Sequence, residues 1–131
     1  VGLVSPSTYV VDPDQLQLMQ LTAQMFGWKT KVGKQVGRRE ASPGDSIPAR
    51  VADLHAMFAD PEVQGIICVR GGYGTPQLLD QLDFELIRKN PKMLLGYSDI
   101  TGLHLAIHQK TNLVTFHGPT GLSPFTEFSQ N

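Results

Sequence analysis

The chain has 131 residues, of which 40% are apolar and 18% charged, and these values fit one globular domain with a real core. The net charge is −1 without any basic run, which argues against a surface that binds nucleic acid or anionic membranes. No apolar run approaches the about 18 residues of a membrane span. The single cysteine, Cys68, excludes a disulfide within the chain and fits a reducing, cytoplasmic compartment.

Strand and helix patterns alternate along the chain. Continuous apolar runs such as Gly65–Val69 are typical of strands buried on both faces, as in a parallel sheet. Asp12-Pro13 indicates a helix start, and apolar residues then recur at helical spacing. In chain order, the expected elements are a strand at Val1–Val4, a helix from Pro13 to a stop at Gly27, a weak strand at Lys29–Val36, a loop at Gly37–Ser46, a helix at Ile47–Ala59, a strand at Gly65–Val69, short helical pieces at Thr75–Leu82 and Phe84–Lys89, a strand at Met93–Leu95, a helix at Ile100–Gln109 and a strand at Leu113–Phe116. This order predicts one α/β domain over residues 1–131, with an open, mostly parallel sheet and helices on both faces.

Three polar or glycine-containing loops follow predicted strands, at Arg70–Gly74, Tyr97–Asp99 and His117–Pro119. Ligands of open α/β sheets bind at the carboxyl ends of the strands, so these loops are expected to share one functional edge. The glycines of Arg70–Gly74 allow backbone N–H groups to approach a ligand closely. A phosphate loop fits poorly, because neither a following Lys-Ser/Thr nor G-x-G-x-x-G is present. The loop is therefore an oxyanion or anion site, or an ordinary tight turn.

Ser98 lies where an apolar strand passes directly into a helix. The local pattern, Gly96-Tyr97-Ser98-Asp99, matches the Gly-x-Ser-x-Gly nucleophile elbow only in part. On such a turn a serine projects from the sheet, and the N–H of the next residue, Asp99, can face an oxyanion. The alternative is that Ser98 or Asp99 simply caps the following helix.

A serine nucleophile needs a neighbouring base, and no histidine supplies one convincingly. His55, His104 and His108 fall within helices and fit packed or solvated positions better. His117 follows a strand at the expected edge, where it fits a base, a substrate contact or a structural hydrogen bond. Cys68 lies inside a strand and is not expected to act as a nucleophile. The sequence shows no metal-binding spacing, and we expect no cofactor.

Four segments together resemble the LD-carboxypeptidases, serine peptidases of murein recycling that include the microcin C self-immunity hydrolases as a branch. The segments extend over nearly the whole chain in order: 50–61, Arg70–Gly74, 90–101 and 115–119. The resemblance implies an N-terminal domain with a fold similar to class I glutamine amidotransferases, in agreement with the α/β prediction above.

The resemblance also implies residue roles. Ser98 would be the nucleophile of a Ser-His-Glu triad, and the backbone N–H groups of Asp99 and Gly72 would form the oxyanion hole. Gly71, Tyr73 and His117 would contact the substrate. The implied reaction is hydrolysis of the bond to the terminal D-alanine of a murein tetrapeptide through an acyl-enzyme.

Family members carry a second, C-terminal domain that supplies the histidine and glutamate. We therefore expect this chain to be the nucleophile-bearing N-terminal half, inactive by itself and prone to form homodimers through the surface left uncovered. Two alternatives remain open at this point. One is a microcin-type immunity hydrolase, and the other is a non-catalytic α/β binding module.

Overall fold

The predicted strands form a single parallel sheet in the computed structural model, which describes residues 1–8, 12–38 and 46–119. The strands are β1 (Gly2–Val4), β2 (Lys31–Val32), β3 (Gly65–Cys68), β4 (Met93–Gly96) and β5 (Phe116–His117). They are ordered β2-β1-β3-β4-β5, and each neighbouring pair is parallel. The open parallel α/β fold expected from the sequence is confirmed.

The helices begin and end close to the predicted positions. They are α1 (Pro13–Met25), α2 (Ile47–Ala59), α3 (Phe84–Lys89) and α4 (Thr101–Thr111), with short 3-10 turns η1 (Thr75–Gln77), η2 (Leu79–Gln81) and η3 (Ser98–Ile100). Asp12 caps α1 as expected, since its carboxylate accepts a hydrogen bond from the Asp14 N–H at 2.9 Å. None of the helices in the described residues has the length and apolar character to cross a bilayer.

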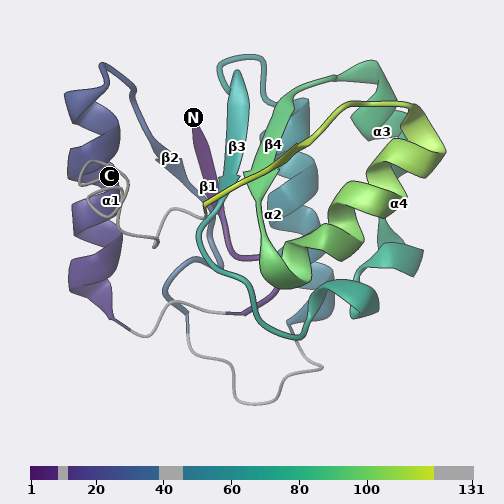
Figure 1. Ribbon diagram of the computed structural model, residues 1–131, viewed down its shortest axis with the longest axis horizontal. Helices are drawn as coiled ribbons and strands as arrows, with labels where there is room; N and C mark the ends of the chain where they lie inside the picture. The colour runs from purple at the N-terminus through teal and green to yellow at the C-terminus, as the bar shows by residue number, and fades with distance from the viewer. Residues whose placement is uncertain (9–11, 39–45, 120–131) are drawn as a thin grey trace.

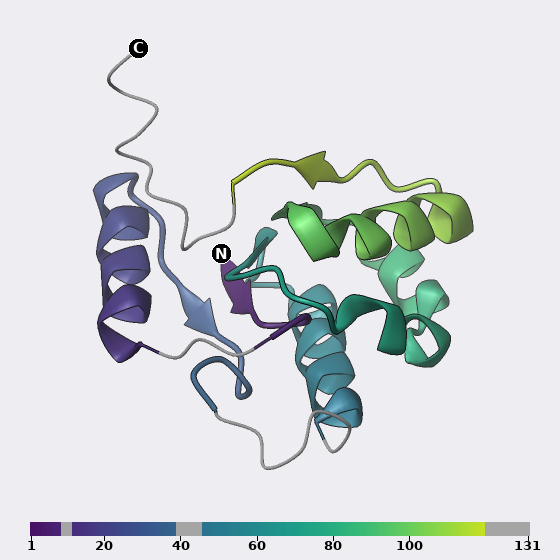
Figure 2. The same cartoon turned by 60° about the horizontal axis from the view of Figure 1, so that its bottom comes forward.

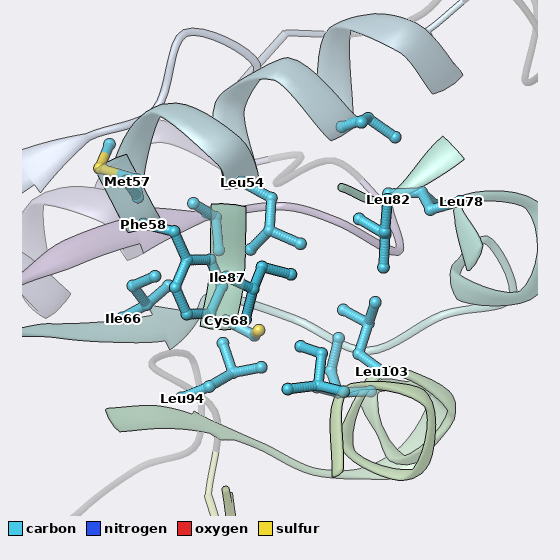
Figure 3. Packing of buried hydrophobic residues seen from close by; sticks show 14 of the residues in the cluster. Leu54, Met57, Phe58, Ile66, Cys68, Leu78, Leu82, Ile87, Leu94 and Leu103 are labelled. Carbon is cyan, nitrogen blue, oxygen red and sulfur yellow. The ribbon is translucent and has the colours of Figure 1, made fainter. Parts of the chain in front are cut away.

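Helices cover both faces of the sheet, as Figure 1 and Figure 2 show with α1 on one side and α2 and α4 on the other. Successive strand residues point to opposite faces, so Leu3 and Ile67 pack with Met19 of α1. The second face holds the larger core, in which Phe58 of α2 is fully buried among strand and helix side chains (Figure 3). Each such buried aliphatic or aromatic side chain contributes about 1.5–3 kcal/mol.

The strand order places the functional edge. From β1 the chain runs outward through α1 to the edge strand β2, and then returns through α2 to β3 on the other side of β1. Beyond β3 the strands continue outward in order. The strand order reverses between β1 and β3, and in this class of sheet ligands bind outside the carboxyl ends of the strands at such a reversal. Three loops therefore meet at one edge: the loop after β1, which contains Ser7, the glycine loop Arg70–Gly74 after β3, and the turn Tyr97–Asp99 after β4.

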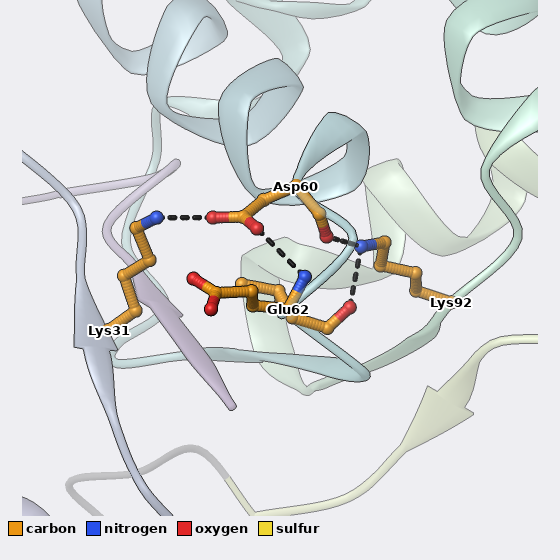
Figure 4. Close-up of polar contacts among 5 residues, drawn as sticks. Lys31, Asp60, Glu62 and Lys92 are labelled. Atoms are coloured by element: carbon orange, nitrogen blue, oxygen red, sulfur yellow. Dashed lines mark hydrogen bonds and ion pairs between the residues drawn. The ribbon is translucent and has the colours of Figure 1, made fainter.

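Polar contacts fasten the opposite, amino edge of the strands. Lys31 forms an ion pair with the carboxylate of Asp60, at the end of α2 (Figure 4). Lys92, just before β4, donates to the backbone carbonyls of Asp60 and Val63, the latter at 2.5 Å. The hydrogen bond from Lys31 lowers the pKa of the Asp60 carboxyl, and the same contact raises the pKa of Lys31. These contacts are structural and lie away from the three loops.

Two predicted strands differ from the observed ones. The strand expected at Lys29–Val36 is reduced to β2, because a turn begins at Gly33 and is held by a hydrogen bond from the Gln35 N–H to Asp53 at 2.6 Å. The strand expected at Leu113–Phe116 begins only at Phe116, so His117 lies within β5 and not in the loop after it. Asn112 ends α4 in a left-handed conformation, and Leu113 then packs back against the core. Most of the predicted loop Gly37–Ser46 lies outside the described residues.

Candidate active site

Ser98 occupies a strained position at the carboxyl edge. Its backbone has a φ of 62°, in the left-handed region that residues other than glycine rarely adopt. It follows the extended Tyr97 and opens the turn η3, and it is exposed. Such strain persists only where surrounding contacts fix it, and it concentrates at functional sites. This is the backbone geometry of a nucleophile elbow.

The capping alternative does not account for this turn. The N-cap positions of η3 and α4 are held by Tyr97 and Ile100, and not by Ser98 or Asp99. Neither N-cap residue makes a side-chain capping hydrogen bond. The Ser98 hydroxyl makes no hydrogen bond to residues 1–8, 12–38 or 46–119. The Asp99 carboxylate reaches across to other loops instead of back to its own helix.

The glycine loop lies directly against this turn. A β-carbon built on Gly71 would lie 3.1 Å from Cβ and 3.3 Å from Oγ of Ser98. A β-carbon on Gly72 would lie 2.8 Å from the Ser7 hydroxyl oxygen, and one on Gly74 would lie 2.2 Å from the Ser7 carbonyl oxygen. The glycines thus permit a close approach of three loops. Gly71 is the glycine whose open side faces Ser98, whereas Gly72 adjoins the loop after β1.

Asp99 joins the three loops through its side chain. Its Oδ2 atom accepts hydrogen bonds from the Ser7 hydroxyl and, at 2.9 Å, from the Thr75 N–H. The Thr75 hydroxyl also donates to the Asp99 carbonyl at 2.6 Å. Burial by itself raises the pKa of Asp99, but the hydrogen bonds from Ser7 and Thr75 outweigh it and hold that pKa below its usual range. Asp99 is therefore an anion at neutral pH.

Ser7 and Thr75 were not singled out by the sequence patterns. Ser7 gave one usable signal, because Ser5-Pro6-Ser7 follows the first predicted strand and so belongs to the same edge. Thr75 only appeared as the start of a short helical piece. Their importance comes from contacts with Asp99, which is 92 residues from Ser7 and 24 residues from Thr75 in sequence.

Arg50 stabilises the loop after β1 through hydrogen bonds to its backbone carbonyls. This side chain, 4% exposed, extends from α2 and donates through Nη1 to the carbonyls of Pro6 at 2.8 Å and Ser7 at 3.0 Å. Its Nε donates to the Ser46 hydroxyl at 2.9 Å. A buried guanidinium with several donors satisfies backbone carbonyls that helices and strands leave unpaired. Arg50 thus fixes the loop that carries Ser7.

Three of the four histidines pair with backbone atoms, and the fourth, His117, is exposed in β5. His104 is buried, and its Nε2 pairs with the Gly96 carbonyl at 2.9 Å, which confirms a packed position in α4. His55 and His108 pair with backbone atoms elsewhere, His55 with the Asp83 N–H and His108 with the Leu113 carbonyl. His117 is exposed in β5, where its ring lies 6.5 Å from that of Tyr97 and 6.2 Å from that of His104, measured between centroids. Tyr73 is 94% exposed at the tip of the glycine loop.

Cys68 is fully buried in β3, and burial raises the pKa of its thiol well above its usual range. It cannot supply a thiolate at neutral pH. Within the ranges that the structure describes, no three His, Cys, Asp or Glu side chains are grouped to hold a metal ion. The candidate reactive groups at this edge are the Ser98 hydroxyl, the backbone N–H groups around it and the Asp99 carboxylate.

An open parallel sheet with a strained serine at its carboxyl edge, packed against a glycine loop, is the type of α/β domain in which nucleophile elbows occur. The chain belongs to the LD-carboxypeptidase family, because the sequence profile of the LD-carboxypeptidase N-terminal domain matches residues 1–118.

Individual relatives agree with this assignment. The chain is 45% identical over 119 residues to a probable murein peptide carboxypeptidase of Bacillus subtilis, covering 91% of this chain and 37% of the relative. It is 34% identical to the murein tetrapeptide carboxypeptidase of Pseudomonas aeruginosa, covering 96% of this chain and 42% of that protein. The crystal structure of an MccF-like protein from Bacillus anthracis superposes with a TM-score of 0.86 at 38% identity, covering 92% of this chain and 37% of that one. The chain therefore spans less than half the length of the curated relatives described here.

Proposed function

We propose that this chain is the nucleophile-bearing domain of a serine LD-carboxypeptidase that releases the terminal D-alanine of murein tetrapeptides. The observation that carries the proposal is Ser98 itself, exposed at the carboxyl edge with a φ of 62° and with the open side of Gly71 against it. The similarity to the two murein peptide carboxypeptidases supports the choice of substrate.

In the proposed reaction, the Ser98 hydroxyl gives its proton to a general base while its oxygen attacks the carbonyl carbon of the bond to D-alanine. The N–H groups of Asp99 and Gly72 stabilise the oxyanion of the tetrahedral intermediate. Collapse of that intermediate breaks the C–N bond, the same base returns the proton to the departing D-alanine amine, and an acyl group remains on Ser98. Water then hydrolyses the ester and regenerates the serine.

The general base in this proposal comes from another domain. The side chain of His104 is committed to the Gly96 carbonyl, and His117 lies beside Tyr97 in β5. The relatives extend well beyond the matched region, which leaves ample sequence for a second domain that supplies the histidine and glutamate. We assign substrate contacts to Gly71, Tyr73 and His117, because Gly71 adjoins Ser98 and the two side chains are exposed.

The test uses the intact protein that contains this chain, incubated with a murein tetrapeptide that ends in D-alanine. We expect D-alanine release, and we expect Ser98→Ala to lower kcat by about 10³-fold or more. Release that persists in Ser98→Ala contradicts the nucleophile assignment. The isolated chain 1–131 is expected to release none, and release that depends on Ser98 would contradict the need for a second domain.

A microcin-type self-immunity hydrolase is the second candidate, favoured by the superposition on the MccF-like structure. The two functions share the nucleophile and differ in the substrate. Parallel assays with a murein tetrapeptide and with an aminoacyl sulfamoyl nucleoside separate them. Cleavage of the tetrapeptide alone supports the first proposal, and cleavage of the nucleoside alone supports the second.

We place the reaction in the cytoplasm, which fits the single buried thiol.

We also propose that the domain self-associates. Exposed apolar side chains on α1 support this, with Leu18 65%, Leu21 50% and Met25 87% exposed. Light scattering over a wide concentration range is the measurement, and a monomer throughout contradicts the proposal.

A further inference from the structure

Asp99 is expected to contribute a backbone N–H to the oxyanion hole, but its carboxylate has a separate set of partners. The Ser7 hydroxyl reaches it from the loop after β1, and the Thr75 N–H reaches it from the loop after β3 at 2.9 Å. The Thr75 hydroxyl holds the Asp99 carbonyl at 2.6 Å. The carboxylate and the backbone carbonyl of Asp99 are thus both held by segments that are distant in sequence.

These contacts bear directly on the geometry of Ser98. A serine with a φ of 62° relaxes toward an ordinary conformation unless its neighbours hold it. Ser98 makes no side-chain hydrogen bond of its own in the described residues, so hydrogen bonds can restrain its turn only through its chain neighbours. Asp99, the residue that follows Ser98, makes polar contacts to two other segments through Ser7 and Thr75. Fixing its α-carbon also fixes the direction of its N–H.

We propose that the Asp99 carboxylate, held by Ser7 and Thr75, is a positioning group that keeps the strained Ser98 turn and the Asp99 N–H in their reactive arrangement. This inference rests on the proposed function. The carboxylate does not touch the reacting atoms. It acts by clamping the turn after β4 to the loops after β1 and β3, and Arg50 supports the clamp by donating to the Ser7 carbonyl at 3.0 Å.

The first experiment compares Asp99→Ala and Asp99→Asn in the intact enzyme with the murein tetrapeptide. Misplacement of a reacting group by about 1 Å costs about 100-fold in rate, so Asp99→Ala should lower kcat by about that factor. Asn keeps one acceptor oxygen without the charge, and we expect a partial rescue to about a 10-fold loss. KM should stay within about twofold of wild type in both variants, because the change falls on the transition state.

Matched controls separate positioning from general destabilisation. Asp53 is a buried aspartate that takes no part in the contacts of Ser98, and its carboxylate accepts a hydrogen bond of 2.6 Å from the Gln35 N–H. Asp53→Asn should lower the free energy of unfolding and leave kcat unchanged. Ser5 is buried at the same edge as Ser7, but its hydroxyl has no partner among the described residues. Ser7→Ala should therefore lower kcat, whereas Ser5→Ala should not.

Thr75 provides a pair that leaves Asp99 intact and decides the matter if Asp99→Ala fails to fold. Thr75→Val removes the hydroxyl that holds the Asp99 carbonyl, and Thr75→Ser retains it. We expect kcat to fall only in Thr75→Val. Values of kcat within twofold of wild type in Asp99→Asn, Ser7→Ala and Thr75→Val, while Ser98→Ala is inactive, would overturn the positioning role and leave the proposed function standing. An active Ser98→Ala would instead overturn the proposed function.

Discussion

Gly71 lies against Ser98 so closely that a β-carbon at position 71 would be 3.1 Å from the Ser98 Cβ and 3.3 Å from its Oγ. The contact joins the loop after β3 to the turn after β4, two segments that follow neighbouring parallel strands. A side chain at this position would crowd the Ser98 hydroxyl. From this contact we expect Gly71 to matter for catalysis through the space that it leaves beside Ser98.

Gly71→Ala is therefore expected to impair activity more than stability. The added methyl group would displace Ser98 by a few tenths of an ångström, and we expect kcat to fall by about 10-fold or more. Gly102→Ala is the matched control, since a β-carbon there meets nothing closer than the Thr75 hydroxyl at 3.4 Å. Gly102→Ala should keep its activity and gain up to about 1 kcal/mol, because alanine is the better helix former. Equal kcat values in the two variants would contradict the role of Gly71.

Arg50→Met is expected to destabilise the domain severely. The change removes the donors to two backbone carbonyls, those of Pro6 and Ser7, and leaves them buried without partners. Unsatisfied groups of this kind cost about 1–3 kcal/mol each, so we expect a loss of about 3 kcal/mol or more in urea unfolding. Arg88→Met is the control, because Arg88 pairs with Glu85 and donates to the Lys110 carbonyl at the exposed surface, where water replaces lost partners and such contacts contribute about 0–1 kcal/mol. A similar loss in both variants contradicts this account.

The pH dependence of stability should report the Asp99 carboxylate. Its pKa is lowered in the folded protein, so the stabilisation is fully present above the unfolded value of about 3.9 and is lost as the pH falls through the folded value. Asp99→Asn has no such group. The difference in unfolding free energy between wild type and Asp99→Asn should therefore be constant between about pH 7 and 5 and shrink below about pH 4. A difference that stays unchanged at about pH 3 would show that the carboxylate is not ionically stabilised.

Cys68 should be unreactive in the native protein. It is fully buried in β3, so a reagent in solution cannot reach its sulfur. Burial also raises the pKa of the thiol, so the reactive thiolate does not form at neutral pH. A thiol reagent that releases a yellow product should react with one thiol per chain only after the protein unfolds in urea. The reaction should follow the loss of the helical circular dichroism signal. Rapid stoichiometric labelling in buffer contradicts the burial.

The types and order of the elements follow from local sequence. Helices α2 and α3 begin and end where apolar spacing and flanking residues indicate, because these signals act within a few residues. The short strands were less well determined. β5 is shifted to Phe116–His117 because the left-handed Asn112 and the packing of Leu113 override a weak strand preference. Strand limits of this kind depend on pairing with a neighbour that local sequence does not specify.

The sequence by itself determined an open parallel α/β sheet, a glycine loop and a serine turn at the same edge, and Ser98 as the candidate nucleophile. Only the tertiary structure decided that Ser98 is held in a left-handed conformation, that Gly71 faces it, and that Asp99 is clamped by Ser7 and Thr75. The physical reason is the range of the interactions. Helix caps and apolar periodicity act between near neighbours, whereas the clamp joins residues up to 92 positions apart, which meet only after the sheet has assembled.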